Sequence, residues 1–177
     1  MGWLVRKISR AKWEPKPEEL GPNAIQADAV TSDLRTQGNS LSFWQCVDPN
    51  NEDELREVAL ALAGASERVD KIDIAWIKED FLRKKGFSIE RTEGKTQVVD
   101  LRNKHVDLIK LDLQKICSLA KCLCKSIRKE GNFRRFTKGE VLQILREAAQ
   151  EGRLYVDALP EKIRAELKNL TPASETE

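Results

Sequence analysis

Three runs in the first half of the chain are mainly apolar and have the length of strands. They cover residues 2–8, 41–47 and 69–77. In the last of them, apolar residues first alternate with charged ones and then continue without interruption, which is typical of a strand that enters a buried core. Residues 14–23 contain three prolines and a glycine, so we expect no regular structure between the first strand and the rest.

Helical spacing of apolar residues follows the second of these strands. Residues 51–64 begin with acidic residues, place apolar side chains three and four positions apart and end at Gly64, which together predict a helix. With the strands on either side of it, this helix would form a strand, helix, strand unit over residues 41–77.

Weaker patterns lie on both sides of that unit. A short helix is expected over residues 24–36, and another of about two turns should end at Gly86. Residues 87–101 have the composition of a hairpin whose tip is at residues 93–95.

From residue 106 onward the strand signal ends and the pattern becomes helical. Helices are predicted over residues 106–130, 138–151 and 158–169, with a frayed tail at 171–177. In the first helix the apolar residues recur at steps of three and four and form one seam: Val106, Ile109, Leu113, Ile116, Ala120, Leu123 and Ile127. This seam must be covered either by the protein's own sheet and later helices or by a partner chain.

The second of these helices has a clear start signal. Thr137 and Glu140 have the spacing of a capping box, in which each side chain accepts a hydrogen bond from a free backbone N–H.

These elements predict an α+β fold class. A small mixed β-sheet with helices would occupy residues 1–103, and a three-helix part over residues 104–170 would pack on it, either as a second unit or within one domain. The length of 177 residues suits such a fold, because a chain of this size buries roughly 70% of its unfolded surface.

Composition adds few restrictions. Hydrophobic residues make up 40% of the chain and charged residues 34%, which are proportions of a globular protein. The 31 Lys and Arg residues nearly balance the 29 Asp and Glu residues, so the net charge of +2 gives no overall attraction for a polyanion. No stretch approaches the roughly 18 apolar residues of a membrane span, and no secretory signal is visible, so we expect a cytoplasmic protein without membrane contact.

One region departs from this balance. Residues 102–138 carry a net charge of about +8, and Lys121, Lys125 and Arg128 would share the side of the helix that faces away from the seam. The candidate binding surface comprises Lys121, Lys125, Arg128, Lys129, Phe133, Arg134 and Arg135, of which the last three are expected in a loop. Such a surface would attract an acidic protein partner, or would contact the phosphates and bases of a nucleic acid. In a third interpretation the lysines are only a solvated helix back that complements the helix dipole.

Aromatic and cysteine residues supply further candidates. Trp13 lies in a basic segment bordered by prolines, where it would be exposed and available as an anchor for a partner. Cys117, Cys122 and Cys124 belong to one expected helix, but Cys122 would point about 140° away from Cys117 around the axis. One helix therefore does not direct all three thiols at one ion, and we expect no metal site.

Catalytic candidates are few. His105 is the sole histidine, which limits general-base chemistry, and a metal-dependent nuclease would rest on Asp73 and Asp100. The sequence contains no GxSxG, HExxH or glycine-rich phosphate loop.

The sequence thus favours a non-catalytic intracellular interaction protein of the adaptor, regulator or toxin-neutralising kind. We expect its partner to be a protein with an acidic surface, and we expect no cofactor. A nucleic-acid-binding accessory protein that uses the same basic side chains is the alternative, and an enzyme is the third class. The sequence does not specify the oligomeric state.

Overall fold

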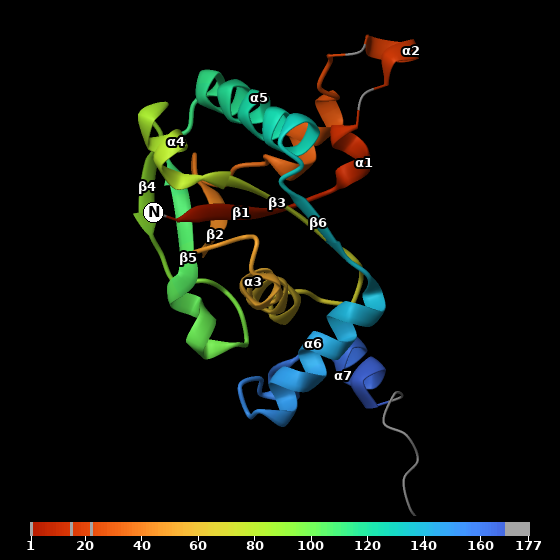
Figure 1. Ribbon diagram of the computed structural model, residues 1–177. Coiled ribbons are helices and arrows are strands. Elements are labelled where there is room, and N and C mark those ends of the chain that lie inside the picture. The colour runs from red at the N-terminus through yellow and green to blue at the C-terminus, as the bar shows by residue number, and fades with distance from the viewer. Residues whose placement is uncertain (1, 15, 22, 169–177) are drawn as a thin grey trace, which may run out of the picture.

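A computed structural model of the chain describes residues 2–14, 16–21 and 23–168, and it confirms the α+β fold class. Six strands form one sheet in the order β4-β5-β2-β1-β3-β6 (Figure 1). Their bounds are β1 (Trp3–Ile8), β2 (Leu41–Cys46), β3 (Ile72–Lys78), β4 (Ser88–Arg91), β5 (His105–Ile109) and β6 (Phe133–Phe136). Every pairing is antiparallel, so the prediction of a mixed sheet is wrong in this detail.

The expected strand, helix, strand unit is present, with one more strand inserted into it. β1 lies between β2 and β3 and is antiparallel to both, with Val5 opposite Trp44 on one side and Trp76 on the other. β2 and β3 therefore run in the same direction, and α3 (Glu52–Gly64) connects them across one face of the sheet.

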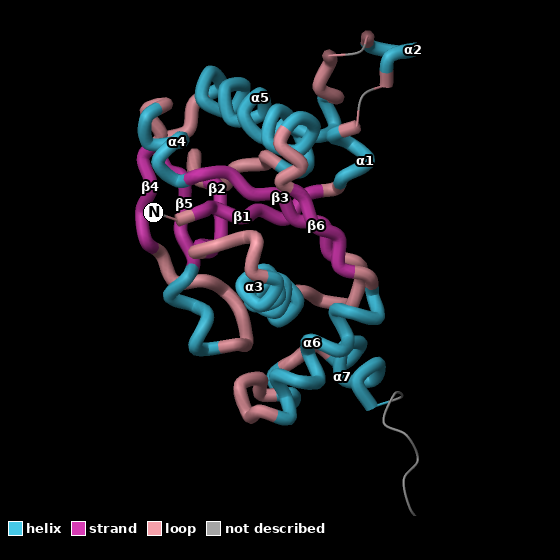
Figure 2. The backbone as a smooth tube through the Cα atoms, in the orientation of Figure 1, coloured by secondary structure: helices cyan, strands magenta, loops and turns pink. Residues whose placement is uncertain are grey.

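Helices cover both faces of the sheet. α5 (Leu113–Lys129), α4 (Glu79–Lys84) and α1 (Arg10–Trp13) lie on one side, while α3, α6 (Lys138–Gln150) and α7 (Glu161–Lys168) lie on the other (Figure 2). Because side chains alternate along a strand, Leu4 belongs to the core under α5 and its neighbour Val5 to the core under α3. Two apolar cores thus share one sheet.

The prediction that strands end before residue 106 is wrong. β5 occupies the start of the expected long helix, and β6 occupies the expected loop. In β5 the buried residues Val106 and Leu108 point into the core under α5, two positions apart as in a strand, whereas the predicted helical seam used Val106 and Ile109, three positions apart. α5 begins only at Leu113, where the side chain of Asp112 accepts a hydrogen bond of 2.7 Å from the Lys115 backbone N–H.

The hairpin predicted within residues 87–101 is also wrong. β4 pairs with β5, with Ile89 opposite Leu108, and the 3-10 helix η2 (Val99–Lys104) lies in the connection between the two strands. The expected tip at residues 93–95 therefore belongs to a longer connection.

Two other segments differ from expectation. The proline-rich loop contains the four-residue helix α2 (Pro17–Leu20), and the region of the expected helix 24–36 contains the single π-helical turn η1 (Ala29–Asp33). The helix predicted over 158–169 is α7 (Glu161–Lys168), and the short 3-10 helix η3 (Val156–Ala158) precedes it. Residue 169 of the predicted helix and the predicted tail 171–177 lie outside the described residues.

Candidate functional site

The solvent side of α5 carries three exposed lysines, each about one helical turn from the next: Lys121, Lys125 and Lys129. We call them the lysine face. The opposite side of the helix is buried against the sheet, where it contributes Leu119, Ala120, Leu123 and Cys124 to the core. The middle of the predicted seam is therefore covered by the protein's own sheet, whereas Leu113, the first residue of α5, is 78% exposed.

The lysine face is weakly paired. Lys125 Nζ lies 3.4 Å from Glu130 Oε1, and both side chains are about half exposed, so this pair contributes only about 0–1 kcal/mol. Among the described residues, Lys121 and Lys129 form no ion pair. All three ammonium groups are thus available to an anionic surface.

A pocket of about 340 Å³ adjoins the lysine face, and Lys125 belongs to its lining. Its apolar wall consists of Trp3, Ile77, Phe81 and Cys122. We call it the anchor pocket.

One wall of the anchor pocket is held in place by hydrogen bonds, and another presents an uncharged thiol. Ser126 Oγ donates a hydrogen bond of 2.8 Å to the Trp76 carbonyl and accepts one of 2.8 Å from the Asn132 side chain, which holds the end of α5 against β3. Burial raises the pKa of the Cys122 thiol, although Lys85 and Lys125 oppose the shift, so the pocket presents a neutral sulfur.

Arg128 does not contribute to the lysine face as the sequence predicted. Its Nε donates a hydrogen bond of 2.6 Å to the Trp13 carbonyl, and its Nη2 donates one of 3.0 Å to the Ala24 carbonyl. The guanidinium therefore attaches the N-terminal segment to α5 instead of pointing freely into solvent.

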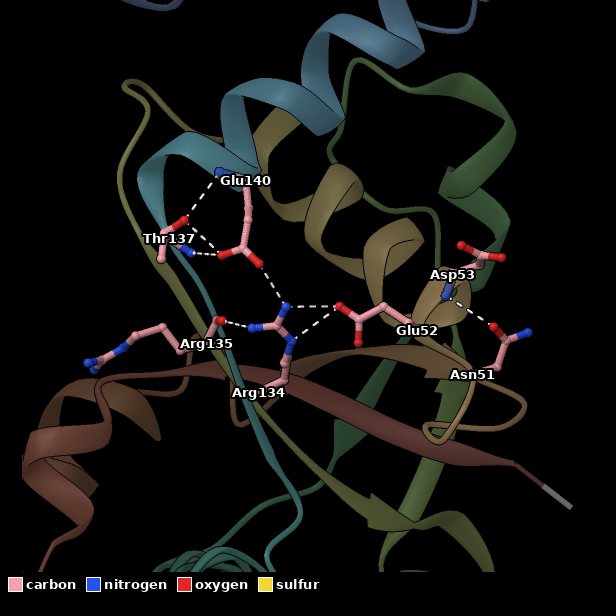
Figure 3. A network of polar contacts seen from close by, with 7 residues as sticks. All are labelled: Asn51, Glu52, Asp53, Arg134, Arg135, Thr137 and Glu140. Atoms are coloured by element: carbon pink, nitrogen blue, oxygen red, sulfur yellow. Dashed lines mark hydrogen bonds and ion pairs between the residues drawn. The ribbon is translucent and has the colours of Figure 1, made fainter.

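Arg134 is also engaged within the protein (Figure 3). Its Nη2 lies 3.0 Å from Glu52 Oε1 at the start of α3 and 2.8 Å from Glu140 Oε1 at the start of α6, so it links two helices. The predicted capping box is confirmed, because Glu140 accepts from the Thr137 backbone N–H at 2.7 Å and Thr137 accepts from the Glu140 N–H. The Thr137 backbone and hydroxyl groups, together with Arg134, lower the pKa of Glu140 from 4.5 to about 2.

Arg135 points to the other face of the sheet and forms a bidentate pair with Asp73. Its Nε and Nη2 donate hydrogen bonds of 2.7 and 2.9 Å to the two carboxylate oxygens. Asp73 is only 5% exposed; burial would raise its pKa, but the hydrogen bonds from Arg135 and from the Arg10 backbone N–H outweigh burial and lower it. The Arg10 guanidinium lies 4.4 Å from the ring centre of Phe133. The expected arginine and aromatic loop is therefore an edge strand whose charges are largely neutralised.

Trp13 is fully buried, so the prediction of an exposed anchor is wrong. Its indole Nε1 donates a hydrogen bond of 2.9 Å to Asp33 Oδ2, which also accepts from the Ser9 backbone N–H at 2.6 Å. The basic segment around Trp13 folds into α1 and closes the core beside α5, an outcome that no local pattern indicates.

The three clustered cysteines have different surroundings. Cys117 is exposed, Cys122 is partly buried and Cys124 is buried. Within the described part of the chain, no three or more His, Cys, Asp or Glu side chains are grouped in a way that could hold a metal ion.

His105 belongs to a polar chain on β5. Its Nδ1 lies 2.7 Å from Thr92 Oγ1, and that hydroxyl donates a hydrogen bond of 2.9 Å to Asp107 Oδ2. Burial lowers the pKa of His105, while the charge of Asp107 opposes the shift. Thr92 and Asp107 were not among the residues predicted from the sequence, although Asp107 lies two residues beyond His105 and strand alternation would place both on one face.

The two aspartates considered for nuclease chemistry do not form a pair. Asp73 binds Arg135, whereas Asp100 lies 2.7 Å from Arg153, which also pairs with Glu57. The two carboxylates therefore belong to separate ion pairs within the protein.

Comparison of the chain with known proteins gives no match to a protein family, a curated protein or a solved structure. Within the described residues no helix combines the length and apolar character needed to span a bilayer.

Proposed function

We propose that this protein is a non-catalytic, cytoplasmic interaction module that binds an acidic partner protein through the lysine face and the anchor pocket. The observation that carries the proposal is their adjacency: Lys125 is a member of the lysine face and also lines an apolar pocket. An apolar pocket edged by an exposed lysine, whose one ion pair with Glu130 is weak, is an arrangement in which one anchor side chain of a partner is buried while charges orient it.

The two parts have different tasks. Burying one large apolar side chain in the anchor pocket would contribute about 1.5–3 kcal/mol, and the pocket volume of about 340 Å³ lies within the range of ligand pockets. The exposed lysines add long-range attraction, which accelerates association and rejects basic partners. We therefore expect the partner segment to combine an aromatic or aliphatic anchor with neighbouring Asp or Glu residues.

The contacts that the arginines make within the protein favour a protein partner over a nucleic acid. Arg128, Arg134 and Arg135 are engaged by carbonyls or carboxylates of this chain. Most of the guanidinium donors predicted to contact phosphates are therefore used within the protein, and Phe133 is packed under Arg10 instead of being available to stack on a base.

The test is selection of peptides from a random library on the immobilised full chain at low salt. We expect the selected peptides to carry an apolar anchor beside acidic residues. A Lys121→Glu, Lys125→Glu, Lys129→Glu variant should bind them at least about tenfold more weakly. Cys122→Met narrows the anchor pocket without changing its charge, so this variant should bind the selected peptides more weakly by a similar factor.

The matched control is Arg91→Glu with Lys95→Glu and Lys168→Glu, three exposed cations that lie outside both parts of the site and make the same change of net charge. Unchanged peptide binding by this control assigns the loss to the lysine face and not to net charge. Peptides that bind the charge-reversed variant as well as the wild type would refute the proposal. So would tight binding of single- or double-stranded nucleic acid with a steep dependence on salt, which would favour the nucleic-acid alternative.

A further inference from the structure

A second cavity, of about 610 Å³, lies where β1 ends and β3 begins. Its lining comes from the end of β1 and the start of α1, the turn between α3 and β3, the end of β6, and α7. In Figure 1 these elements lie toward the end of the sheet that is away from the N-terminus. The anchor pocket contains Trp3 at the other end of β1, so the two cavities are separate.

The lining of this cavity is predominantly cationic. It includes six Lys and Arg side chains and three carboxylates: Lys7, Arg10, Arg68, Lys71, Arg135 and Lys162 against Glu67, Asp70 and Asp73. We call it the basic cleft. The six cations outnumber the three carboxylates by more than the net charge of the whole chain, which is +2.

Three of these cations are not neutralised by the protein. In the described part of the chain Lys7, Lys71 and Lys162 form no ion pair, and they come from β1, the turn before β3 and α7. Elsewhere the same protein pairs its cations closely, as in the contacts of Arg153 with Glu57 and Asp100 at 2.7 Å each. Like charges from separate elements in one cavity repel each other, and a bound anion would relieve that repulsion.

The basic cleft also contains a positioned guanidinium. Buried Asp73 holds Nε and Nη2 of Arg135 in a bidentate pair, which fixes the plane of the group. Nη1 makes no hydrogen bond within the described residues, and the Arg135 side chain is 43% exposed, so donors remain for a ligand. A fixed arginine surrounded by flexible lysines is suited to phosphate oxygens, which accept hydrogen bonds from both.

We propose that the basic cleft binds an oligophosphate group, meaning two or more linked phosphates. A single phosphate would meet only part of the cationic lining, whereas a chain of phosphates can reach lysines from different elements. Among the described residues that line the cleft none is aromatic, so recognition is of the phosphates and not of an attached base. Inorganic oligophosphate and nucleoside triphosphate supply the same chemistry.

The test is calorimetric titration of the full chain with inorganic triphosphate, ATP and AMP at low salt. We expect triphosphate and ATP to bind with similar affinity and AMP at least about tenfold more weakly. Lys71→Glu with Lys162→Glu, both at exposed positions, should weaken triphosphate binding at least about tenfold while the melting temperature without ligand stays unchanged.

Lys121→Glu with Lys125→Glu is the matched control, since it makes the same change of charge on the lysine face. Wild-type triphosphate binding by this control supports a specific cleft, and it separates this site from the proposed protein-binding function. The inference is overturned if millimolar triphosphate produces no binding signal, or if both variants lose affinity equally. ATP that binds much more tightly than triphosphate would show base recognition and also overturn it.

Discussion

Lys125 and Arg128 are three residues apart on α5, yet their side chains have different environments. Lys125 remains at the surface beside the anchor pocket, whereas Arg128 reaches the carbonyls of Trp13 and Ala24. The planar guanidinium can donate to two carbonyls at once, and the lysine ammonium lacks that fixed geometry. Two basic residues that look equivalent in the sequence thus differ: Arg128 holds two segments together, whereas Lys125 is available at the surface.

Replacement of Arg128 by Ala should destabilise the protein by about 1.5–3 kcal/mol, because two carbonyls lose a charged donor. The measurement is urea denaturation, read as a lower midpoint with an unchanged slope. Lys121→Ala, on the same helix and exposed, is the control and should stay within about 0.5 kcal/mol of the wild type. Equal midpoints for the two variants would contradict a structural role for Arg128.

Gly94 occupies a position where the backbone closely approaches the Trp44 ring and the Cβ atom of His105. A Cβ atom there would lie 2.5 Å from Trp44 Cη2 and 3.0 Å from His105 Cβ. Gly94→Ala should therefore cost about 1–3 kcal/mol through overpacking. Gly139→Ala in α6 is the matched control, since its nearest neighbour would be 4.0 Å away, and it should be neutral or stabilising by up to about 1 kcal/mol. Thermal unfolding of both variants measures the difference, and a stable Gly94→Ala protein would show that the loop can move away from Trp44.

At the scale of elements, the start of α6 depends on one carboxylate with several partners. Glu140 caps the helix through Thr137 and also binds Arg134, which continues to Glu52 at the start of α3. A local signal in the sequence therefore contributes to a contact between two helices that are far apart in the chain.

This arrangement predicts a specific dependence of stability on pH. The pKa of Glu140 is about 2 in the folded protein against 4.5 ordinarily, so its contribution is present above pH 4.5 and is lost as the pH falls toward 2. In Glu140→Gln the loss is already present at neutral pH, so the stability difference from the wild type should shrink as acid is added. Denaturant titrations across this range test it. Asp73 has a lowered pKa in both proteins, so its effect cancels in the comparison. A difference that is constant with pH would show that the carboxylate charge is not responsible.

The elements that the sequence predicted correctly are those in which one physical signal is strong. α3 has an acidic first turn and helical spacing, α6 has the capping box, and β1, β2 and β3 are apolar runs of strand length. β5 was missed because Val106 and Ile109 continue the spacing of α5, and β6 was missed because two of its four residues are arginines. The helix start at Asp112 could have been found, since Asp is a common capping residue.

The candidate site was predictable only in part, for a related reason. Helical spacing correctly placed Lys121 and Lys125 on the exposed side of α5, but it placed Arg128 with them, where the structure has Lys129. The groups that bind Arg128, Arg134 and Arg135 within the protein lie between 6 and 115 positions away along the chain. The anchor pocket and the basic cleft also combine residues from distant elements, so no local pattern reveals them.

At the scale of the whole molecule, the central strand β1 connects the two candidate sites. Trp3 at its start lines the anchor pocket, and Lys7 near its end lines the basic cleft. Because β1 pairs along its length with β3, the relative position of the two sites is fixed by the most central part of the sheet. Binding at one site is therefore expected to leave the other intact, which permits the two proposals to be tested on the same protein.

The sheet also determines which fragments should fold. β5 lies between β4 and β2, and β6 lies beside β3, so residues after 104 supply both an internal strand and an edge strand. A fragment of residues 1–103 would lack β5 and the α5 side of one core, leaving Leu41 and Phe43 of β2 without Leu108 and Val106 opposite them. We expect this fragment to be unfolded, with no cooperative transition by circular dichroism and a poorly dispersed amide spectrum, whereas the full chain unfolds cooperatively. Adding residues 104–177 as a separate chain should restore a dispersed spectrum if pairing of β5 with β2 is the missing interaction. A fragment 1–103 that folds alone would instead show that these residues form an independent domain.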